Sequence, residues 1–298
     1  MSGDEILVGF DGSADAKLAL RWALDEARHS GRPVRLAYVF EWLTVGGWVG
    51  PGVAPGVWPD ETARRQVEEL VGRAAADAAA ERPGVTVHGV VLDGPPAVVL
   101  QERSAEAGLL VLGSRGHGGF GGLLAGSTAV AVTAHAHCPV VVVREGRTGA
   151  AGPVVVGFDG SESSRVALGF AVEHAAKRTV PLRVVRVFEP PSGRWRPADR
   201  DEQATAAEER AVVEESLAGW RETCPDVTVE IVVAPGNPAA TLVEASRDAQ
   251  LVVVGSRGRG GLRGMLLGSV SQQLIQHAHC PVAVARESTT DGDGRVGR

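Results

Sequence analysis

Gly113-x2-Gly116-x9-Gly126-Ser127 is repeated 142 positions later as Gly255-x2-Gly258-x9-Gly268-Ser269, and this glycine pattern decides how the chain is interpreted. Each copy follows a short apolar run and precedes a helical pattern. Because glycine has no Cβ, the backbone can turn sharply after a buried strand and bring several N–H groups close to an anion. The free N–H groups and positive dipole end of a helix that begins at Gly-Ser favour phosphate. The pattern therefore predicts a phosphate-binding loop in each half of the chain.

The surrounding sequence is duplicated as well. Ile6-Leu-Val-Gly-Phe-Asp-Gly-Ser13 returns as Val154-Val-Val-Gly-Phe-Asp-Gly-Ser161, and His135-Ala-His-Cys-Pro-Val140 returns as His277-Ala-His-Cys-Pro-Val282. A period of half the chain is too long for a solenoid repeat and equals one ordinary domain. We predict two copies of one domain, over residues 1–146 and 152–287, joined by a short polar linker. Residues 288–298 contain no apolar anchor and are expected to form a disordered tail.

Each half alternates short apolar runs with longer helical patterns. In the first half, strands are predicted over 6–10, 34–40, 85–92, 109–113 and 140–144, and helices over 14–29, 60–82, 95–107 and 126–136. Strands of the second half are predicted near 153–158, 182–188, 227–233, 251–255 and 282–286. Apolar runs without alternation are typical of strands covered on both faces. We predict an α/β fold of two tandem doubly wound domains, each a five-stranded parallel sheet in the order 3-2-1-4-5 with helices on both faces.

Composition restricts the setting. With 44% hydrophobic residues, each half is long enough to bury its own core. The net charge of −6 and a pI near 5.8 provide no general attraction for nucleic acid or an anionic membrane. The three cysteines form no paired spacing, and the first residues have neither a basic region nor a long apolar stretch. We therefore expect a cytoplasmic protein with no signal peptide and no membrane span.

Two other phosphate-binding motifs fit less well. Gly116-x-Gly118-x2-Gly121 satisfies the dinucleotide fingerprint, but it follows the fourth predicted strand instead of the first, and Arg263 replaces the third glycine in the second copy. The P-loop pattern fails because no Gly-Lys-Ser/Thr occurs. A tight turn without a ligand is the remaining structural alternative for the glycine pattern.

The combined motif resembles that of a known family. Gly-x2-Gly-x9-Gly-Ser/Thr after a fourth strand, an aspartate that ends the first strand (Asp11 and Asp159) and Cys-Pro-Val at the fifth strand resemble the universal stress protein family in its ATP-binding branch. Both halves carry all of these elements, over roughly residues 4–145 and 153–287. The resemblance implies a tandem member of that family.

The resemblance also implies the site residues. Asp11 and Asp159 would bind ribose, and the positions beside the adenine would be Gly9 and Val39 in the first domain and Gly157 and Val187 in the second. The phosphate-binding residues of the first domain would be Gly113, Arg115, Gly116, Gly126, Ser127 and Thr128, and those of the second Gly255, Arg257, Gly258, Gly268, Ser269 and Val270. Ser127 and Ser269 add hydroxyls for a phosphate oxygen or for Mg²⁺ bound with the nucleotide. For both aspartates, an ordinary cap or turn role is the alternative.

The function implied is an ATP-binding stress-response protein that acts through nucleotide-dependent conformation or partner binding. The alternative is a slow ATPase or nucleotide-transferring enzyme on the same fold. Binding is favoured because the sequence has no Walker lysine, and no His or Glu accompanies both loops to position a water. The expected partners are an adenine nucleotide, the two domains for each other through their last strands, and a second copy of the chain in a homodimer. ATP, AMP and cyclic AMP are not distinguished.

Four features have competing interpretations. The His-x-His-Cys segments contain zinc-ligand types and could form a structural or redox scaffold, but histidine is favourable at a helix C-terminus without a metal, so no metal site is predicted. The tryptophan-containing segment 41–59 either covers a domain edge or binds adenine or a partner. The acidic helix around Glu208, Glu209, Glu214 and Glu215 could be a site, but it is expected to be a solvated face. The second loop has Arg257, Arg259 and Arg263 where the first has Arg115, His117 and Phe120, so we expect tighter ATP binding by the second domain.

Overall fold

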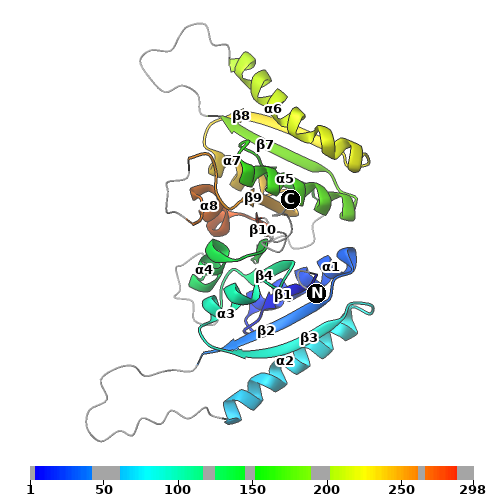
Figure 1. The fold of residues 1–298 in the computed structure, drawn as a ribbon, viewed down its shortest axis with the longest axis vertical. Helices are drawn as coiled ribbons and strands as arrows, with labels where there is room; N and C mark the ends of the chain where they lie inside the picture. The colour runs from blue at the N-terminus through cyan, green and yellow to red at the C-terminus, as the bar shows by residue number, and fades with distance from the viewer. Residues whose placement is uncertain are drawn as a thin grey trace, which may run out of the picture.

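The computed structural model describes residues 4–41, 61–116, 125–144, 152–188, 202–260 and 266–286. Within these ranges, strands and helices alternate along the chain and the second half repeats the first (Figure 1). The segments with Trp42, with the linker and with the tail, on which several sequence expectations rest, lie outside the described residues.

The first half contains β1 (Ile6–Gly9), α1 (Ala14–Ser30), β2 (Val34–Phe40), α2 (Glu61–Glu81), β3 (Val87–Asp93), α3 (Pro96–Arg103), β4 (Leu109–Gly113), α4 (Ser127–His135) and β5 (Val140–Val143). The second half contains β6 (Val154–Gly157), α5 (Glu162–Arg178), β7 (Leu182–Phe188), α6 (Glu202–Thr223), β8 (Val229–Pro235), α7 (Pro238–Ala245), β9 (Leu251–Gly255), α8 (Ser269–His277) and β10 (Val282–Ala285). No helix in the described ranges has both the length and the apolar character needed to cross a membrane.

Local chemistry sets the ends of these helices. The Oγ of Ser13 accepts a hydrogen bond from the N–H of Ala16 at the start of α1, and Gly31 ends that helix with a φ of 72°. Ser161 caps α5 in the same way. Helix α3 ends four residues before the predicted boundary, because the Oγ of Ser104 turns back to the carbonyl of Gln101 and accepts from the N–H of His137.

The described strands form one ten-stranded sheet in the order β3-β2-β1-β4-β5-β10-β9-β6-β7-β8. Each half, read from its outer edge, has its own strands in the order 3-2-1-4-5, and all pairings within a half are parallel. The predicted fold class is therefore confirmed, and the other predicted boundaries agree with the observed ones to within two residues.

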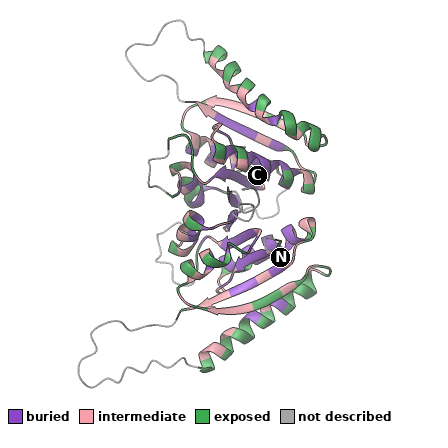
Figure 2. Ribbon diagram, viewed as in Figure 1, coloured by how far each residue is buried: buried purple, intermediate pink, exposed green. Residues whose placement is uncertain are grey.

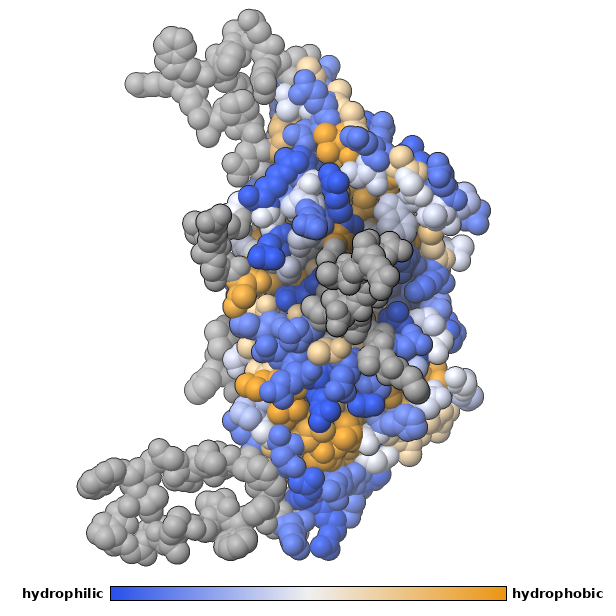
Figure 3. All heavy atoms as spheres, in the orientation of Figure 1, coloured by the Kyte–Doolittle hydropathy of each residue, from blue (hydrophilic) through white to orange (hydrophobic). Residues whose placement is uncertain are grey.

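Helices cover both faces of the sheet. One apolar core lies under α1, α2, α5 and α6, and a second lies under α3, α4, α7 and α8. Both cores contain residues of both halves. Burial is highest in the central strands, whereas α2 and α6 at the two ends of the molecule are exposed along most of their outer surface (Figure 2). The visible surface is mainly hydrophilic, with apolar patches, of which the most extended lies in the lower half of the view (Figure 3).

The two halves meet at the centre of the sheet. Strands β5 and β10 pair antiparallel, with Val142 opposite Val282. The Nη1 of Arg144, beyond β5, donates to the carbonyls of Gln276 and Ala278 at 2.8 Å, at the end of α8. Arg286, beyond β10, makes the reciprocal contacts at the end of α4. Cations are stabilising at the negative end of a helix, so each half stabilises a helix of the other.

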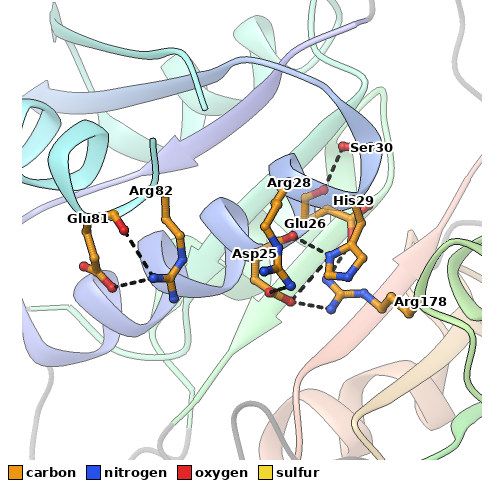
Figure 4. A network of polar contacts seen from close by, with 8 residues as sticks. All are labelled: Asp25, Glu26, Arg28, His29, Ser30, Glu81, Arg82 and Arg178. Atoms are coloured by element: carbon orange, nitrogen blue, oxygen red, sulfur yellow. Dashed lines mark hydrogen bonds and ion pairs between the residues drawn. The ribbon is translucent and has the colours of Figure 1, made fainter. Parts of the chain in front are cut away.

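A second contact between the halves joins α1 and α5. Arg178 of α5 reaches across to the carboxylates of Asp25 and Glu26 on α1 (Figure 4), with Nη2 of Arg178 at 3.0 Å from Oε2 of Glu26. His174 is stacked on Trp22 at 5.9 Å between ring centroids, and its Nδ1 lies 3.3 Å from the same Oε2. Glu26 and His174 are buried, so this interface between α1 and α5 combines ion pairs with aromatic stacking.

Candidate phosphate loops at the carboxyl edge of the sheet

The predicted glycine loops lie where the strand order reverses. In each half, the first strand pairs with the second on one side and with the fourth on the other. The loops after β1 and β4, and those after β6 and β9, therefore lie next to each other. A Cβ built on Gly116 would lie 2.5 Å from Oδ2 of Asp11, and one built on Gly258 would lie 2.8 Å from Oδ2 of Asp159. The structure therefore brings each predicted aspartate against its glycine loop.

The first glycine of each loop is required by packing. A Cβ on Gly113 would lie 2.7 Å from the backbone carbonyl carbon of Asp15, and one on Gly255 would lie 2.6 Å from the carbonyl oxygen of Ser163. Each of these glycines lets the end of the fourth strand rest directly on the first turn of a helix, α1 or α5. Their presence is thus explained without any ligand.

The last glycine of each loop is not explained in this way. Gly126 has φ −72° and Gly268 has φ −70°, which any residue can adopt. Among the described residues, a Cβ at either site would meet no heavy atom closer than 3.4 Å. The N–H of Gly126 donates to the carbonyl of Ser114 at 2.7 Å, and that of Gly268 donates to Ser256 at 2.8 Å. These bonds join the two parts of the motif and direct the start of α4 or α8 toward the loop.

Helices α4 and α8 also begin without a side-chain cap. Ser127 and Ser269 stand exposed at their first positions, followed by Thr128 and Val270, which are half-buried. The first N–H groups of a helix have no partner within the helix, so they are available to an acceptor outside it. An anion at this point would meet backbone donors, an exposed hydroxyl and the positive end of a helix dipole.

The two aspartates hold the turns after β1 and β6. Oδ1 of Asp11 accepts from the N–H of Ser13 at 3.0 Å, and Oδ1 of Asp159 accepts from Ser161 at 2.9 Å. Oδ2 of Asp159 also accepts from the N–H of Arg259 at 2.9 Å. Burial alone would raise the pKa of Asp159, but the hydrogen bonds from Ser161 and Arg259 outweigh burial and hold that pKa below its usual value. The Asp159 carboxylate is therefore a charged acceptor at neutral pH.

The first loop contains a carboxylate that the second lacks. Oδ2 of Asp15 accepts from the Oγ of Ser114 at 2.7 Å and from the backbone N–H of Arg115 at 3.1 Å, and the Nε of Arg115 lies 3.4 Å away. The Asp15 side chain is only 7% exposed. At the corresponding position of the second half, the Oγ of Ser163 accepts from the N–H of Arg257 at 3.3 Å. The same backbone donor thus points at a charged group in one domain and at a neutral hydroxyl in the other.

Arginines surround the second loop instead. Arg186 of β7 is buried; its Nε donates to Oε2 of Glu209 at 2.6 Å, and its Nη1 donates to the carbonyl of Phe158 at 3.4 Å. A Cβ on Gly160 would lie 2.6 Å from Nη2 of Arg259 and 3.7 Å from Nη1 of Arg186, so both guanidinium groups approach the turn after β6. The expectation that Glu209 belongs to a solvated face is wrong for this residue, because it neutralises a buried arginine.

Tyr38 of β2 occupies the place of Arg186 in the first half, as the parallel registers of the two halves show. Burial and the nearby carboxylate of Asp11 raise the pKa of Tyr38. The first site therefore has a neutral phenol where the second has a guanidinium. Arg263, His117 and Phe120, which carried part of the predicted difference between the loops, lie outside the described residues.

The residues predicted beside adenine line the apolar side of the same edge. A Cβ on Gly9 would lie 2.5 Å from Cδ2 of Leu112, and one on Gly157 would lie 2.7 Å from Cδ1 of Leu242. Val39 and Val187 are half-buried and pack against the core under α3, α4, α7 and α8. Both glycines are therefore explained by packing against leucine, and Val39 and Val187 lie near the ends of strands that pair with β1 and β6, the strands that precede the aspartates.

The His-x-His-Cys segments are built into the helix ends. Nδ1 of His135 lies 2.9 Å from the carbonyl of Ala131, and the N–H of His279 donates to Ser246 at 2.8 Å. Cys138 and Cys280 are fully buried, and burial raises the pKa of each thiol to about 12. No group of three or more potential metal ligands occurs in the part of the chain that the structure describes.

Sequence reasoning missed Asp15, Ser163, Tyr38 and Arg186. No motif contains them, because they act through contacts between elements far apart in the sequence. A position-by-position comparison of the two halves would have exposed them, since Asp15 aligns with Ser163 and Tyr38 aligns with Arg186. At both pairs of positions, the two otherwise duplicated sites differ in charge.

This architecture defines a tandem doubly wound α/β protein with a glycine loop opposite the first-strand aspartate in each domain. The model of the universal stress protein family matches residues 4–144 and 151–286. A universal stress protein of Mycobacterium tuberculosis H37Rv is 36% identical over 292 residues, covering 96% of this chain and 97% of the relative. One of Mycolicibacterium smegmatis is 39% identical over 289 residues, with 94% and 96% covered. The chain belongs to the universal stress protein family.

A solved structure is similar over the whole length of the chain. The universal stress protein of Archaeoglobus fulgidus DSM 4304 superposes with a TM-score of 0.70 at 20% sequence identity, covering 96% of this chain and 97% of that one. At this identity the likeness concerns the fold alone, and it includes the tandem arrangement.

Proposed function

We propose that this universal stress protein binds ATP, with one nucleotide site in each of its domains (1–146 and 152–287), and acts through nucleotide-dependent conformation or partner binding. The observation that carries the proposal is the state of Gly126 and Gly268. Neither backbone conformation nor packing against the described residues requires glycine there, yet each glycine precedes a helix that begins without a side-chain cap. A glycine at a point where the described residues leave room for a side chain is what a bound phosphate would demand.

The proposed roles follow from the chemistry of the groups. Asp11 and Asp159 would accept hydrogen bonds from ribose hydroxyls, because a charged carboxylate is a strong acceptor. The apolar side chains of Val39 and Val187 would contact the adenine ring. The loop backbone, Arg115 and Arg257 would hold the phosphates, together with the starts of α4 and α8. The exposed hydroxyls of Ser127 and Ser269 could ligate Mg²⁺ that arrives with the nucleotide, since Mg²⁺ prefers oxygen ligands.

Binding is favoured over hydrolysis by the state of the carboxylates. A general base must be able to take up a proton, but although burial raises the pKa of Asp159, hydrogen bonds from Ser161 and Arg259 outweigh burial and lower that pKa. Asp15 is buried and already accepts three hydrogen bonds from Ser114 and Arg115. The lowered pKa of Asp159 makes this carboxylate a hydrogen-bond acceptor and a weak base.

The setting belongs to the same proposal. Cys138, Cys224 and Cys280 form no disulfide, as expected of a protein of the reducing cytoplasm. The two domains would associate within one chain through β5 and β10, which pair at the centre of the sheet. A nucleotide that tightens one loop could then act on the other domain through α4 and α8, whose ends contact Arg286 and Arg144.

Isothermal titration of nucleotide-stripped protein with ATP and Mg²⁺ tests the proposal. Two binding events per chain are expected, and the double variant Gly126→Ala with Gly268→Ala should lose them while melting at the same temperature. An exposed helix glycine, changed in Gly72→Ala, has open space around its Cβ and serves as the control. Absence of ATP binding by the wild type would leave a turn-forming scaffold. Turnover of ATP that the double variant abolishes would instead support the enzyme alternative.

A further inference from the structure

The two loops share their backbone geometry but differ in charge. In the first domain, Arg115 and Asp15 form an ion pair beneath the loop, and the Asp15 carboxylate also takes the Arg115 backbone N–H. In the second, Ser163 takes the equivalent N–H of Arg257 through a neutral hydroxyl. Among the described residues, Arg257 and Arg259 make no ion pair.

The surroundings strengthen this difference. The second loop has Arg186 and Arg259 near the turn at Gly160, and Glu209 neutralises Arg186. The first loop has Tyr38 in place of Arg186. A nucleoside triphosphate has several more negative charges than a nucleoside monophosphate, and unit charges in a partly buried site interact strongly because the effective dielectric constant is low. Among the described residues, the Asp15 carboxylate offsets the charge of Arg115 in the first loop, so the second loop attracts additional phosphate charge more strongly.

We propose that Asp15 is a selectivity residue that lowers the affinity of the first domain for nucleoside polyphosphates. The first site then takes an adenosine ligand with one phosphate or none, and the second site is the triphosphate site. This inference rests on the proposed nucleotide-binding function and deepens it. It assigns the two domains different ligands, so that one chain responds to both the triphosphate and its degradation products.

The test compares adenosine, AMP and ATP by isothermal titration in the full chain. Wild-type protein should show one tight and one weak ATP event. Asp15→Asn, which keeps size and an acceptor oxygen, should tighten the weak event at least tenfold and leave the tight one unchanged. Ser163→Asp should weaken the tight event at least tenfold. Adenosine affinity should stay within twofold in both variants, because adenosine has no phosphate that could interact with a carboxylate at position 15 or 163.

Two controls separate charge from structure. Ser163→Asn is matched in size to Ser163→Asp but adds no charge, so it should change ATP affinity by less than threefold. Asp77→Ser removes an exposed carboxylate from α2 and should change nothing. If Asp15→Asn binds ATP as the wild type does, or if adenosine and ATP affinities change together, the selectivity role is overturned while nucleotide binding stands. If none of the three ligands binds to the wild type, both proposals fall.

Discussion

Acidification should lower the stability of the protein through His174, which lies in the α1–α5 interface between the two domains. Burial is the main reason that the pKa of this imidazole falls from 6.5 to about 3, and the positive charges of Arg178, His29 and Lys177 lower it further. Glu26 faces His174 at 3.3 Å, but Arg178 already neutralises that carboxylate. The ring is therefore neutral in the folded protein at any pH above about 3.

The size of the effect follows from proton linkage. Below pH 6.5 the unfolded chain protonates this histidine and the folded chain does not, so stability falls as the pH falls. Each pH unit corresponds to about 1.4 kcal/mol, which gives a loss of about 2 kcal/mol between pH 6.5 and pH 5 from this residue. Above the unfolded pKa the contribution of His174 does not change with pH.

Urea unfolding at pH 7.5 and pH 5.0 measures the loss in the wild type and in His174→Phe. Phenylalanine keeps an aromatic ring between Trp22 and Phe170 and leaves Glu26 paired with Arg178. Other groups titrate equally in both proteins, so the difference between the two acid-induced losses reports His174. The variant should lose about 2 kcal/mol less than the wild type. Equal losses in both proteins would refute the neutral, buried imidazole.

Three further predictions concern the loops. Gly113→Ala should cost about 1–3 kcal/mol of stability because its Cβ would clash with backbone, whereas Gly126→Ala should cost less than about 0.5 kcal/mol. Thermal melts of the two variants measure this difference, and equal costs would contradict the packing argument. The free energy of unfolding should fall as the pH drops through the lowered pKa of Asp159, and Asp159→Asn should remove that part of the acid sensitivity. If the variant and the wild type lose stability equally with falling pH, the hydrogen-bonded carboxylate is contradicted. Glu209→Gln should cost about 2 kcal/mol or more in urea unfolding, because it leaves buried Arg186 without its counter-charge, and a neutral result would show that water reaches that guanidinium.

Much of the fold could be predicted because its signals are local. Apolar runs of strand length, the caps at Ser13 and Gly31 and the duplication fix the alternation of strands and helices, and short right-handed connections then leave few strand orders. The loops were recognisable for the same reason, since each glycine motif is contiguous with the strand and helix that frame it. The end of α3 was misplaced because the hydroxyl of Ser104 bonds to a segment more than thirty residues away.

The sequence by itself determined the two domains, their strand order and the position of the glycine loops. Tertiary structure decided which glycines packing requires, that Glu209 neutralises a buried arginine, and that Asp15 faces the first loop where Ser163 faces the second. The physical reason is that hydrogen bonding along the backbone and the burial of apolar runs depend on neighbours in sequence. The charge of a site depends on side chains that converge from separate elements, and only the folded chain brings those together.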